Sequence, residues 1–263
     1  MMKSALLQMR AVLAIARNTF REAIRNKILG ALLLCAAGVM AFSLVLGAMS
    51  LHHEVRVATD VGLFASTVFA MLITVYVSIN LVQTEIERRT IYTILSKPVR
   101  RWQFLLGKFL GILLLVGAIL LLLFAVSAGL RLFQGGAVTL PFAWSYLLVF
   151  FQMMIVASIS LLFASFSSPL LSGLLSAGVF VAGHLHSQLE LVADFFEIEA
   201  VRTTVGFLEF VVPNLSSMNT ATEVVRDIPI PPTYLLNAAW YTASYSALVL
   251  LLAMLIFQRR DLV

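Results

Sequence analysis

The residues best suited to chemistry lie in one polar stretch, 84–111, between two strongly apolar segments, and their chemistry is ion pairing. Glu85 stands three and four residues before Arg88 and Arg89, the spacing at which an acid and a base meet on one helix face. Pro98 is expected to end that helix, because the residue before a proline is pushed out of the helical region. We interpret 84–103 as a cytoplasmic elbow that binds a partner, with contact residues Glu85, Glu87, Arg88, Arg89, Ser96, Lys97, Pro98 and Arg100. The competing interpretation is a solvated helix end that keeps the preceding segment from sliding.

Metal and thiol chemistry have weaker support. The four histidines are His52, His53, His184 and His186. Imidazole suits zinc and copper, but His184 and His186 are two residues apart and point to nearly opposite faces of a helix. We therefore expect no metal site and keep this pair only as a weak candidate. The single cysteine, Cys35, lies in an apolar segment with no evident base partner, which excludes a disulfide framework and gives no catalytic nucleophile.

The sequence contains no ATP-binding loop of the form G-x-x-x-x-G-K-[ST]. The pair Gly107 and Lys108 resembles its end, but Trp102 stands at the first glycine position and Phe109 at the Ser/Thr position. Backbone binding of phosphate and the magnesium-binding hydroxyl are both missing. We expect this chain to be no enzyme and to hold no cofactor, so that ATP and Mg would be bound by a partner ATPase. Gly107 and Gly111 are spaced to let two helices approach closely, within one chain or between two.

The composition is that of an integral membrane protein. Of 263 residues, 61% are hydrophobic and 12% charged, and the mean hydropathy is +0.99. Soluble domains are about a quarter charged. The net charge of +5 and the pI near 9.7 do not indicate nucleic acid, because the basic residues are spread along the chain rather than gathered in one patch.

Residues 1–27 predict an amphipathic helix lying in the membrane interface. Apolar residues recur at steps of three and four, and basic residues line the neighbouring face. The apolar set is Leu6, Met9, Leu13, Ala16, Phe20 and Ile24, and the basic set is Arg10, Arg17, Arg21 and Arg25. As a simple anchor, this helix would bind acidic lipid headgroups at about 1 kcal/mol per exposed charge.

Residues 28–263 predict one all-α transmembrane domain with six spans, because six apolar stretches approach the roughly 20 residues that a bilayer demands. These stretches are 28–51, 61–83, 104–130, 143–166, 170–189 and 236–257. With the N-terminus inside, 14 of the 18 Lys and Arg residues are cytoplasmic, and four are outside: Arg56, Arg131, Arg202 and Arg226. This bias predicts an N-in, C-in topology.

The outer segment 190–235, between spans five and six, is long and mixed in polarity. Its part 195–212 is too polar to span alone and predicts re-entrant or interfacial helices, which Pro213 and Asn214 then interrupt. The spans hold hydroxyls but almost no ionised side chains, which argues against a proton-coupled carrier. We therefore predict an amphiphilic or lipid-like substrate. The span hydroxyls belong to Ser66, Thr67, Thr74, Ser78, Ser158, Ser160 and Ser176.

These parts resemble the membrane subunit of an ABC-2-type (type V) ABC exporter. The resemblance is strongest in EIERRTIYTILSKPVRRWQFLLGKFLG at 85–111, and weaker in PNLSSMN at 213–219 and RRDL at 259–262. It implies a permease in the bacterial cytoplasmic (inner) membrane whose elbow docks on ATP-hydrolysing partners. The complex would hold two ABC ATPase subunits and a second permease copy or homologue, with the translocation path between the permeases.

Two other functions remain open at this point. One is a non-transporting membrane scaffold or regulator, which relays ATPase motion to a periplasmic partner through 190–234. It would show ATPase coupling without substrate flux. The other is an intramembrane enzyme, which the sequence supports poorly because it offers neither a nucleophile with its base nor a metal-ligand set.

Overall fold

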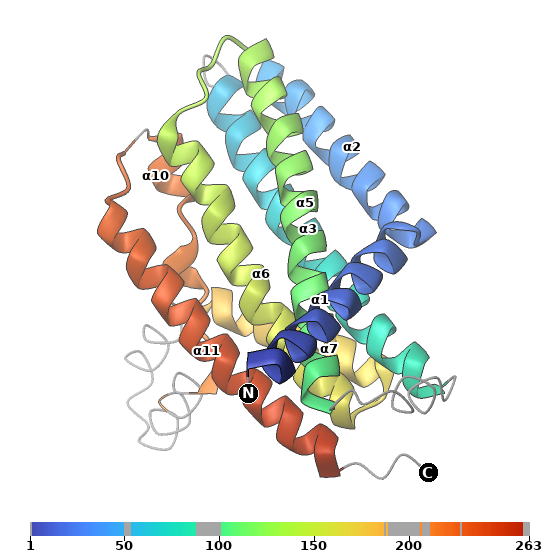
Figure 1. Cartoon of the computed structure of the whole chain (residues 1–263). Helices are drawn as coiled ribbons and strands as arrows, with labels where there is room; N and C mark the ends of the chain where they lie inside the picture. Colours follow the sequence, from blue (N-terminus) through green and yellow to red (C-terminus); the bar gives the residue numbers. More distant parts are fainter. Residues whose placement is uncertain are drawn as a thin grey trace.

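The computed structural model describes residues 2–49, 54–87, 101–186, 188, 206, 211–226 and 228–259, and throughout these residues the regular structure is helical. The helices appear in Figure 1. They are α1 (Met2–Ile24), α2 (Lys27–Met49), α3 (Glu54–Glu87), α5 (Arg101–Phe133), α6 (Leu140–Phe166), α7 (Pro169–His184), the short 3-10 helix η1 (Ser216–Met218), α10 (Ala221–Val225) and α11 (Pro232–Arg259).

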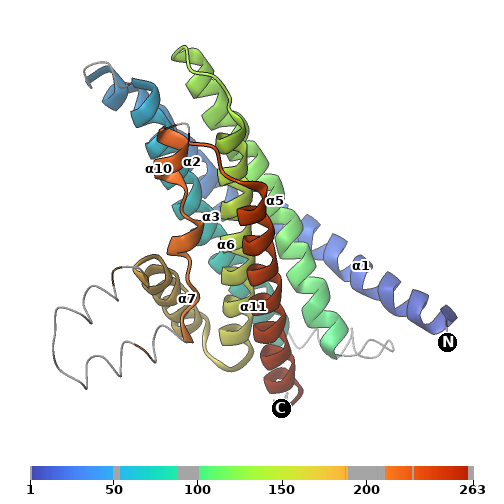
Figure 2. The same cartoon turned by 90° about the vertical axis from the view of Figure 1, so that its left-hand side faces the viewer.

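Five of these helices are long and apolar enough to cross a membrane: α2, α3, α5, α6 and α11. They confirm five of the predicted spans. The predicted fifth span, 170–189, contains α7, which has only 16 residues. Figures 1 and 2 show α7 inclined to the long helices and confined to the lower part of the bundle. Six continuous spans are therefore not confirmed.

The chain nevertheless passes from one end of the bundle to the other between α6 and α11. Helix α6 ends near the C-terminal end of α11, whereas α11 begins near α10 at the opposite end (Figure 2). Segment 211–231, which includes η1 and α10, rises beside α3 and α6 toward the start of α11. Among the described residues, this passage consists of separate short helices, α7, η1 and α10, rather than one long helix.

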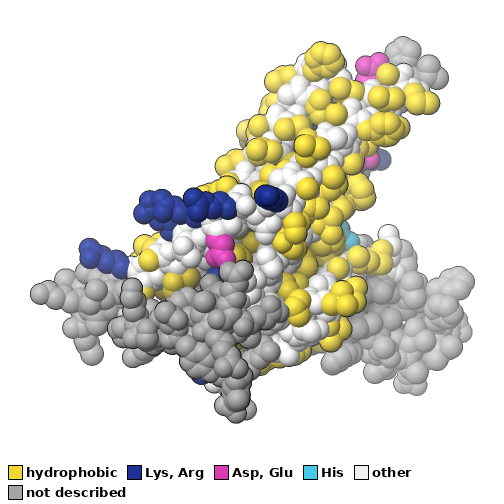
Figure 3. All heavy atoms as spheres, turned by 90° about the vertical axis from the view of Figure 1, so that its right-hand side faces the viewer, with side chains coloured by type: hydrophobic (Ala, Val, Ile, Leu, Met, Phe, Trp, Pro, Cys, Tyr) yellow, Lys and Arg dark blue, Asp and Glu magenta, His cyan; other side chains and the backbone are white. Residues whose placement is uncertain are grey.

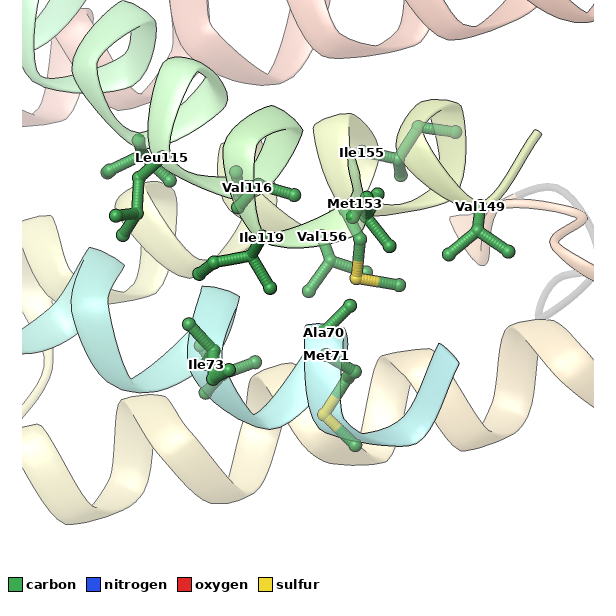
Figure 4. Close-up of a cluster of buried hydrophobic side chains, with 14 of the residues drawn as sticks. Ala70, Met71, Ile73, Leu115, Val116, Ile119, Val149, Met153, Ile155 and Val156 are labelled. Atoms are coloured by element: carbon green, nitrogen blue, oxygen red, sulfur yellow. The ribbon is translucent and has the colours of Figure 1, made fainter. Parts of the chain in front are cut away.

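Helices α3, α5 and α6 pack against one another at the centre of the bundle. Around them, α2 packs on α3, α11 on α6, α1 on α5, and α7 on both α3 and α6. Figure 4 shows the central seam, where Ile73 of α3, Ile119 of α5 and Val156 of α6 point toward one another. All three are buried, whereas large apolar side chains such as Leu34 and Phe42 on α2 are exposed, as expected for a surface that faces lipid.

The helix boundaries follow from local chemistry. Asn26 caps α2, because its Oδ1 accepts a hydrogen bond from the backbone N–H of Ile28 at 3.0 Å. Helices α6 and α7 carry a proline in the first turn, where no backbone donor is required. Helix α5 ends at Phe133, and Gly135, which follows its end, has a φ of +80° that suits a residue without a side chain. The N–H of the next residue, Gly136, returns to the carbonyl of Arg131 at 2.9 Å.

Candidate functional site

The predicted elbow lies between α3 and α5. Its candidate residues Arg88, Arg89, Ser96, Lys97, Pro98 and Arg100 fall outside the described residues, as do the side chains of Glu85 and Glu87. Their roles remain predictions. The structure does describe the two points where the elbow joins the bundle.

At the first point, the end of α3 is fixed to the turn between α6 and α7. Gln83 is buried there, and its Nε2 donates to the carbonyl oxygens of Ala164 at 3.3 Å and Ser167 at 2.7 Å. Ser167 is the residue at which α6 ends, so its carbonyl has no partner within that helix. These two bonds tie the end of α3 to the turn between α6 and α7.

At the second point, the start of α5 is fixed to the end of α11. The Nη1 of Arg101 donates to the carbonyl oxygens of Phe257 at 3.1 Å and Gln258 at 3.0 Å. These are carbonyls of a last helical turn, where a positive charge also complements the helix dipole. One turn further along α5, the ring of Phe104 stacks on that of Phe257 with 6.1 Å between centroids.

Lys108 on α5 is among the largest fully buried side chains of the described residues, with only 1% of its surface exposed. Its Nζ lies 4.0 Å from Oε2 of Glu22 on α1 and 5.6 Å from the centroid of the Phe104 ring. A buried ammonium is costly unless it is paired, so Glu22 holds α1 to the start of α5. From the sequence, Lys108 is a cytoplasmic charge and part of an incomplete ATP-binding motif, and this contact is not predicted.

Two glycines allow α1 to press against α5. A Cβ added at Gly111 would lie 2.6 Å from the Cβ of Thr19 and 2.7 Å from the carbonyl oxygen of Ala16. A Cβ at Gly107 would lie 2.8 Å from the Cβ of Ile15. The pattern of small residues noted in the sequence therefore serves packing within the chain, between α1 and α5.

Helix α1 presents three faces. Its buried face packs on α5 and consists of Val12, Ala16, Thr19 and Ala23. Arg10, Arg17, Arg21 and Arg25 are exposed. Figure 3 shows Lys and Arg side chains in a row along the upper edge of the part of the molecule that extends to the left. Of the predicted apolar face, Met9, Leu13 and Ile24 are exposed, whereas Ala16 belongs to the buried face. Helix α1 lies within the predicted range 1–27, and the residues that seat it on the bundle are small ones such as Ala16 and Ala23 rather than the most hydrophobic ones.

Tyr76 of α3 contacts the junction between α1 and α2, because the Nδ2 of Asn26 donates to its hydroxyl at 3.0 Å. Asn26 lies between α1 and α2, so this bond ties their junction to the middle of α3. We define the coupling frame as the residues that connect α1 and both ends of the elbow to the bundle. It consists of Glu22, Asn26, Tyr76, Gln83, Arg101 and Lys108.

A cavity of 490 Å³ lies between α3, α6, α7 and the η1–α10 segment. Most of its lining is apolar and includes Leu63, Val68, Met71, Val149 and Phe180. Its polar lining includes Asp60, Asn219 and Thr220. An apolar cavity with a few polar groups is the usual form of a small-molecule site.

His184 also lines this cavity, but its contacts are local. Its Nδ1 lies 3.1 Å from the carbonyl oxygen of Phe180, and the two rings are 4.3 Å apart between centroids. His186 is buried nearby on the chain. Within the described part of the chain, no group of three or more His, Cys, Asp or Glu residues could hold a metal ion. His52 and His53 lie outside that part.

Several of the span hydroxyls that the sequence singled out bond within their own helices. Those of Thr67, Thr74 and Ser176 each donate to the carbonyl four residues earlier, at 2.6–2.9 Å. Ser66 does the same at 2.7 Å and also lies 3.0 Å from the hydroxyl of Tyr146. Such bonds satisfy a hydroxyl in an apolar surrounding. These hydroxyls therefore form short local contacts rather than a polar path through the membrane.

Comparison with known families gives one match. A family model described as ABC-2 family transporter protein matches residues 13–262, which is nearly the whole chain. Comparison with curated proteins finds no match. The matched range includes α1 from residue 13 on, both ends of the elbow, and the residues that line the cavity.

Proposed function

Because the chain belongs to the ABC-2 family of transporter proteins, and is thus the permease component of an ABC transporter, we propose that it serves an ATP-driven exporter. In this proposal two ABC ATPase subunits bind ATP and Mg and dock on the elbow 84–103. A second permease copy or a homologue completes the translocation path. The complex lies in the bacterial cytoplasmic membrane and moves an amphiphilic or lipid-like substrate.

The observation that carries the proposal is the coupling frame. Gln83 and Arg101 stand on the two sides of the elbow, and each bonds to two backbone carbonyls of another helix. Hydrogen bonds of a neutral amide such as that of Gln83 contribute about 0.5–1.5 kcal/mol each. Those of a charged group such as Arg101 contribute about 1.5–3 kcal/mol when buried, with less expected here because the bonds are partly exposed. A push on the elbow would therefore move α3, α5, α6 and α11 together rather than bend a loose loop.

The mechanism follows from this rigidity. ATP-driven closure of the ATPase subunits pushes the elbow and α1, and the packed helices respond by rigid-body movement, since tightly packed interfaces shift between discrete arrangements. Helix α7 packs on α3, so movement of α3 is passed to α7 and to the cavity beside it. Arg88, Arg89, Lys97 and Arg100 set the docking register through charge-assisted bonds to acidic residues of the ATPase.

We also propose the N-in, C-in orientation. The end of α11 and the start of α5 lie at one end of the bundle, near the elbow, and α10 lies at the other (Figure 2). The sixth crossing is made by α7 together with segment 211–231. Helix α7 alone would reach only about 24 Å, because 16 residues rise 1.5 Å each, while the hydrocarbon core is about 30 Å thick.

Co-purification in mild detergent tests the proposal, with the accompanying chains identified by mass. We expect an ABC ATPase at one copy per permease, and loss of ATPase coupling when Arg88 and Arg89 are both changed to Glu. The matched control is the double change of the same residues to Lys, which keeps the charge and should keep the coupling. A permease that purifies alone, or with a partner lacking a P-loop, would refute the exporter assignment.

The second candidate, a scaffold or regulator acting on a periplasmic partner, is favoured by the broken passage between α6 and α11, which presents η1 and α10 at the outer end of the bundle. A scaffold or regulator would use the same coupling frame as an exporter but would move no substrate across the membrane. Reconstituted complex with normal ATPase stimulation, but no movement of any lipid or amphiphile across the vesicle membrane, would select it over the exporter.

A further inference from the structure

The 490 Å³ cavity between α3, α6, α7 and the η1–α10 segment is lined by a buried amide that is only half used. Gln152 of α6 is 1% exposed, and its Nε2 donates to the carbonyl oxygen of Leu215 at 3.4 Å. A carbonyl oxygen can only accept, so this bond identifies the other atom, Oε1, as the acceptor of the amide. Among the described residues, Oε1 has no hydrogen-bond partner. A buried acceptor without a donor is costly, which indicates that a ligand supplies the donor.

His184, at the end of α7, presents a second acceptor to the same cavity. Its Nδ1 lies 3.1 Å from the carbonyl oxygen of Phe180, so Nδ1 carries the ring hydrogen and Nε2 of the neutral imidazole accepts. The backbone of Leu215 holds the two acceptor residues together. Its carbonyl accepts from Gln152, and its N–H donates to the carbonyl of Gly183 at 3.0 Å. The two acceptors therefore belong to adjoining walls of one site.

Thr220, directly before α10, adds an unused hydroxyl to the lining. The residue is 5% exposed, and within the described part of the chain its Oγ1 has no partner. It stands at the N-cap position of α10 but makes no side-chain bond to that helix. A hydroxyl both donates and accepts, so this one suits a ligand hydroxyl. The carboxylate of Asp60, exposed at the outer end of the lining, accepts as well.

The amide of Gln152 lies deep in the bundle. Gln83 of α3 bonds to Ala164 of α6, which follows it by 81 residues. The same offset places Gln152 about level with Met71, at the inner end of the lining on α3. From there to Asp60, eleven residues of helix rise about 16 Å. This is about half of a hydrocarbon core about 30 Å thick, so the lining extends from the middle of the membrane to one surface.

The cavity opens onto a surface that faces lipid. Its lining includes Phe64 of α3, which is 68% exposed, and Val181 of α7, which is 53% exposed. Behind this opening, Leu63, Val68 and Met71 make an apolar wall on α3. Each methylene that such a wall removes from water contributes favourably. A molecule with an apolar chain can therefore enter from the bilayer while its polar end reaches the other walls.

We propose that this cavity binds an uncharged amphiphile with a hydroxyl headgroup. The ligand hydroxyls donate to Oε1 of Gln152 and Nε2 of His184 and bond to Oγ1 of Thr220. The apolar chain lies along α3 and leaves through the opening toward lipid. The deep acceptors are neutral, and a charged headgroup beside apolar side chains would be costly without an opposite charge. The site lies inside one permease, so its binding goes beyond the proposed function, and only transport of the ligand would rest on that function.

Photo-cross-linking of the purified full-length permease tests the site in nanodiscs of phosphatidylcholine, a lipid without hydrogen-bond donors. The probe is 1-O-hexadecylglycerol with a diazirine in its alkyl chain, and labelled positions are identified by peptide mass spectrometry. We expect labelling within 60–71 of α3. Unlabelled hexadecylglycerol should displace the probe at least about fivefold more effectively than its dimethyl ether, which lacks only the two donors. That factor is the worth of about one hydrogen bond between neutral groups.

Thr220→Val is the sharpest variant, because it keeps the shape of the side chain and removes a hydroxyl that has no partner among the described residues. It should weaken probe binding about fivefold without lowering thermal stability. Gln152→Leu removes the deep acceptor and should weaken binding by a similar factor. The matched control is Thr19→Val, which removes another buried, unpartnered hydroxyl where α1 packs on α5. It should leave binding within about twofold.

Equal displacement by hexadecylglycerol and its dimethyl ether would show a plain alkyl-chain site and overturns the proposal. Wild-type affinity in both variants, equal loss in the control, or labelling that no competitor displaces overturns it as well. Loss in one variant alone supports the proposal and assigns the ligand hydroxyl to that residue. Reversal of Arg88 and Arg89 should leave binding unchanged, so failure of the exporter proposal remains distinguishable. In the ATPase complex, ATP should lower labelling by a transported ligand and leave labelling by a resident one unchanged.

Discussion

Gly111→Ala is the substitution that most directly probes how α1 is seated on α5. The added Cβ would meet the Cβ of Thr19 at 2.6 Å and the carbonyl oxygen of Ala16 at 2.7 Å. Real Cβ atoms do not approach other atoms so closely, and the second contact is to backbone. Helix α1 must therefore move away from α5, which would also disturb the pairing of Glu22 with Lys108.

The size of the effect follows from a control in the same helix. Gly129 also lies in α5, but a Cβ there meets nothing within 4 Å. Both changes gain about 1 kcal/mol in helix propensity, so their difference isolates the overpacking, which costs typically 1–3 kcal/mol. At a few degrees per kcal/mol, Gly111→Ala should melt on the order of 2–12 °C below Gly129→Ala.

The assay is thermal unfolding of both variants in one detergent, together with ATPase stimulation in the complex. We expect Gly111→Ala to lose both stability and coupling, and Gly129→Ala to keep both. Equal melting temperatures would show that α1 is not packed on α5 as described. Lower stability with unchanged coupling would show that α1 does not transmit the movement of the ATPase.

Three further predictions concern the coupling frame. Arg101→Ala removes the bonds to the last carbonyls of α11, so hydrogen exchange of the amides in 255–259 should rise several-fold. Exchange at the centre of α6 should stay unchanged and serves as the control. Unchanged exchange at 255–259 would contradict this prediction. Tyr76→Phe removes the bonds that the Tyr76 hydroxyl accepts from Asn26 at 3.0 Å and, more weakly, from Asn80 at 3.5 Å, and should cost about 1 kcal/mol in the free energy of unfolding. No measurable cost would show that these bonds do not contribute to stability. Lys108→Met replaces a buried charge with an apolar chain of similar length and should be tolerated in thermal unfolding, whereas Lys108→Ala leaves a cavity and should be destabilising by about 2 kcal/mol or more. Equal melting of the two Lys108 variants would refute this.

The sequence was sufficient for the long helices, because hydropathy and charge placement depend on local composition. Five spans appear where apolar runs predicted them, and Pro169 begins α7 as its position suggests. The length of α7, in the region predicted as the fifth span, could not be predicted from the sequence. Its apolar run at 170–189 has nearly the length of a span, and the end of α7 at His184 depends on contact with segment 211–226, where the N–H of Leu215 bonds to the carbonyl of Gly183.

The functional contacts were less predictable, since they join residues far apart in the chain. Lys108 and Glu22 are separated in the chain by the whole of α2 and α3, and nothing local marks them as a pair. The residues that pack α1 on α5 were not predicted, for a different reason. Hydrophobicity identifies the face that meets lipid, whereas close packing of helices requires small residues such as Ala16 and Gly111.

Site-directed cross-linking tests the central claim, that the elbow transmits ATPase movement, most directly. Cys35 is the only cysteine, so Cys35→Ala gives a background for single cysteines at chosen positions. From Arg89→Cys, the account predicts a cross-link to a P-loop ATPase whose yield changes when ATP is added. From Val138→Cys, in the exposed connection between α5 and α6, it predicts none. A cross-link from position 138, or an ATPase that co-purifies but never cross-links from position 89, would contradict the account.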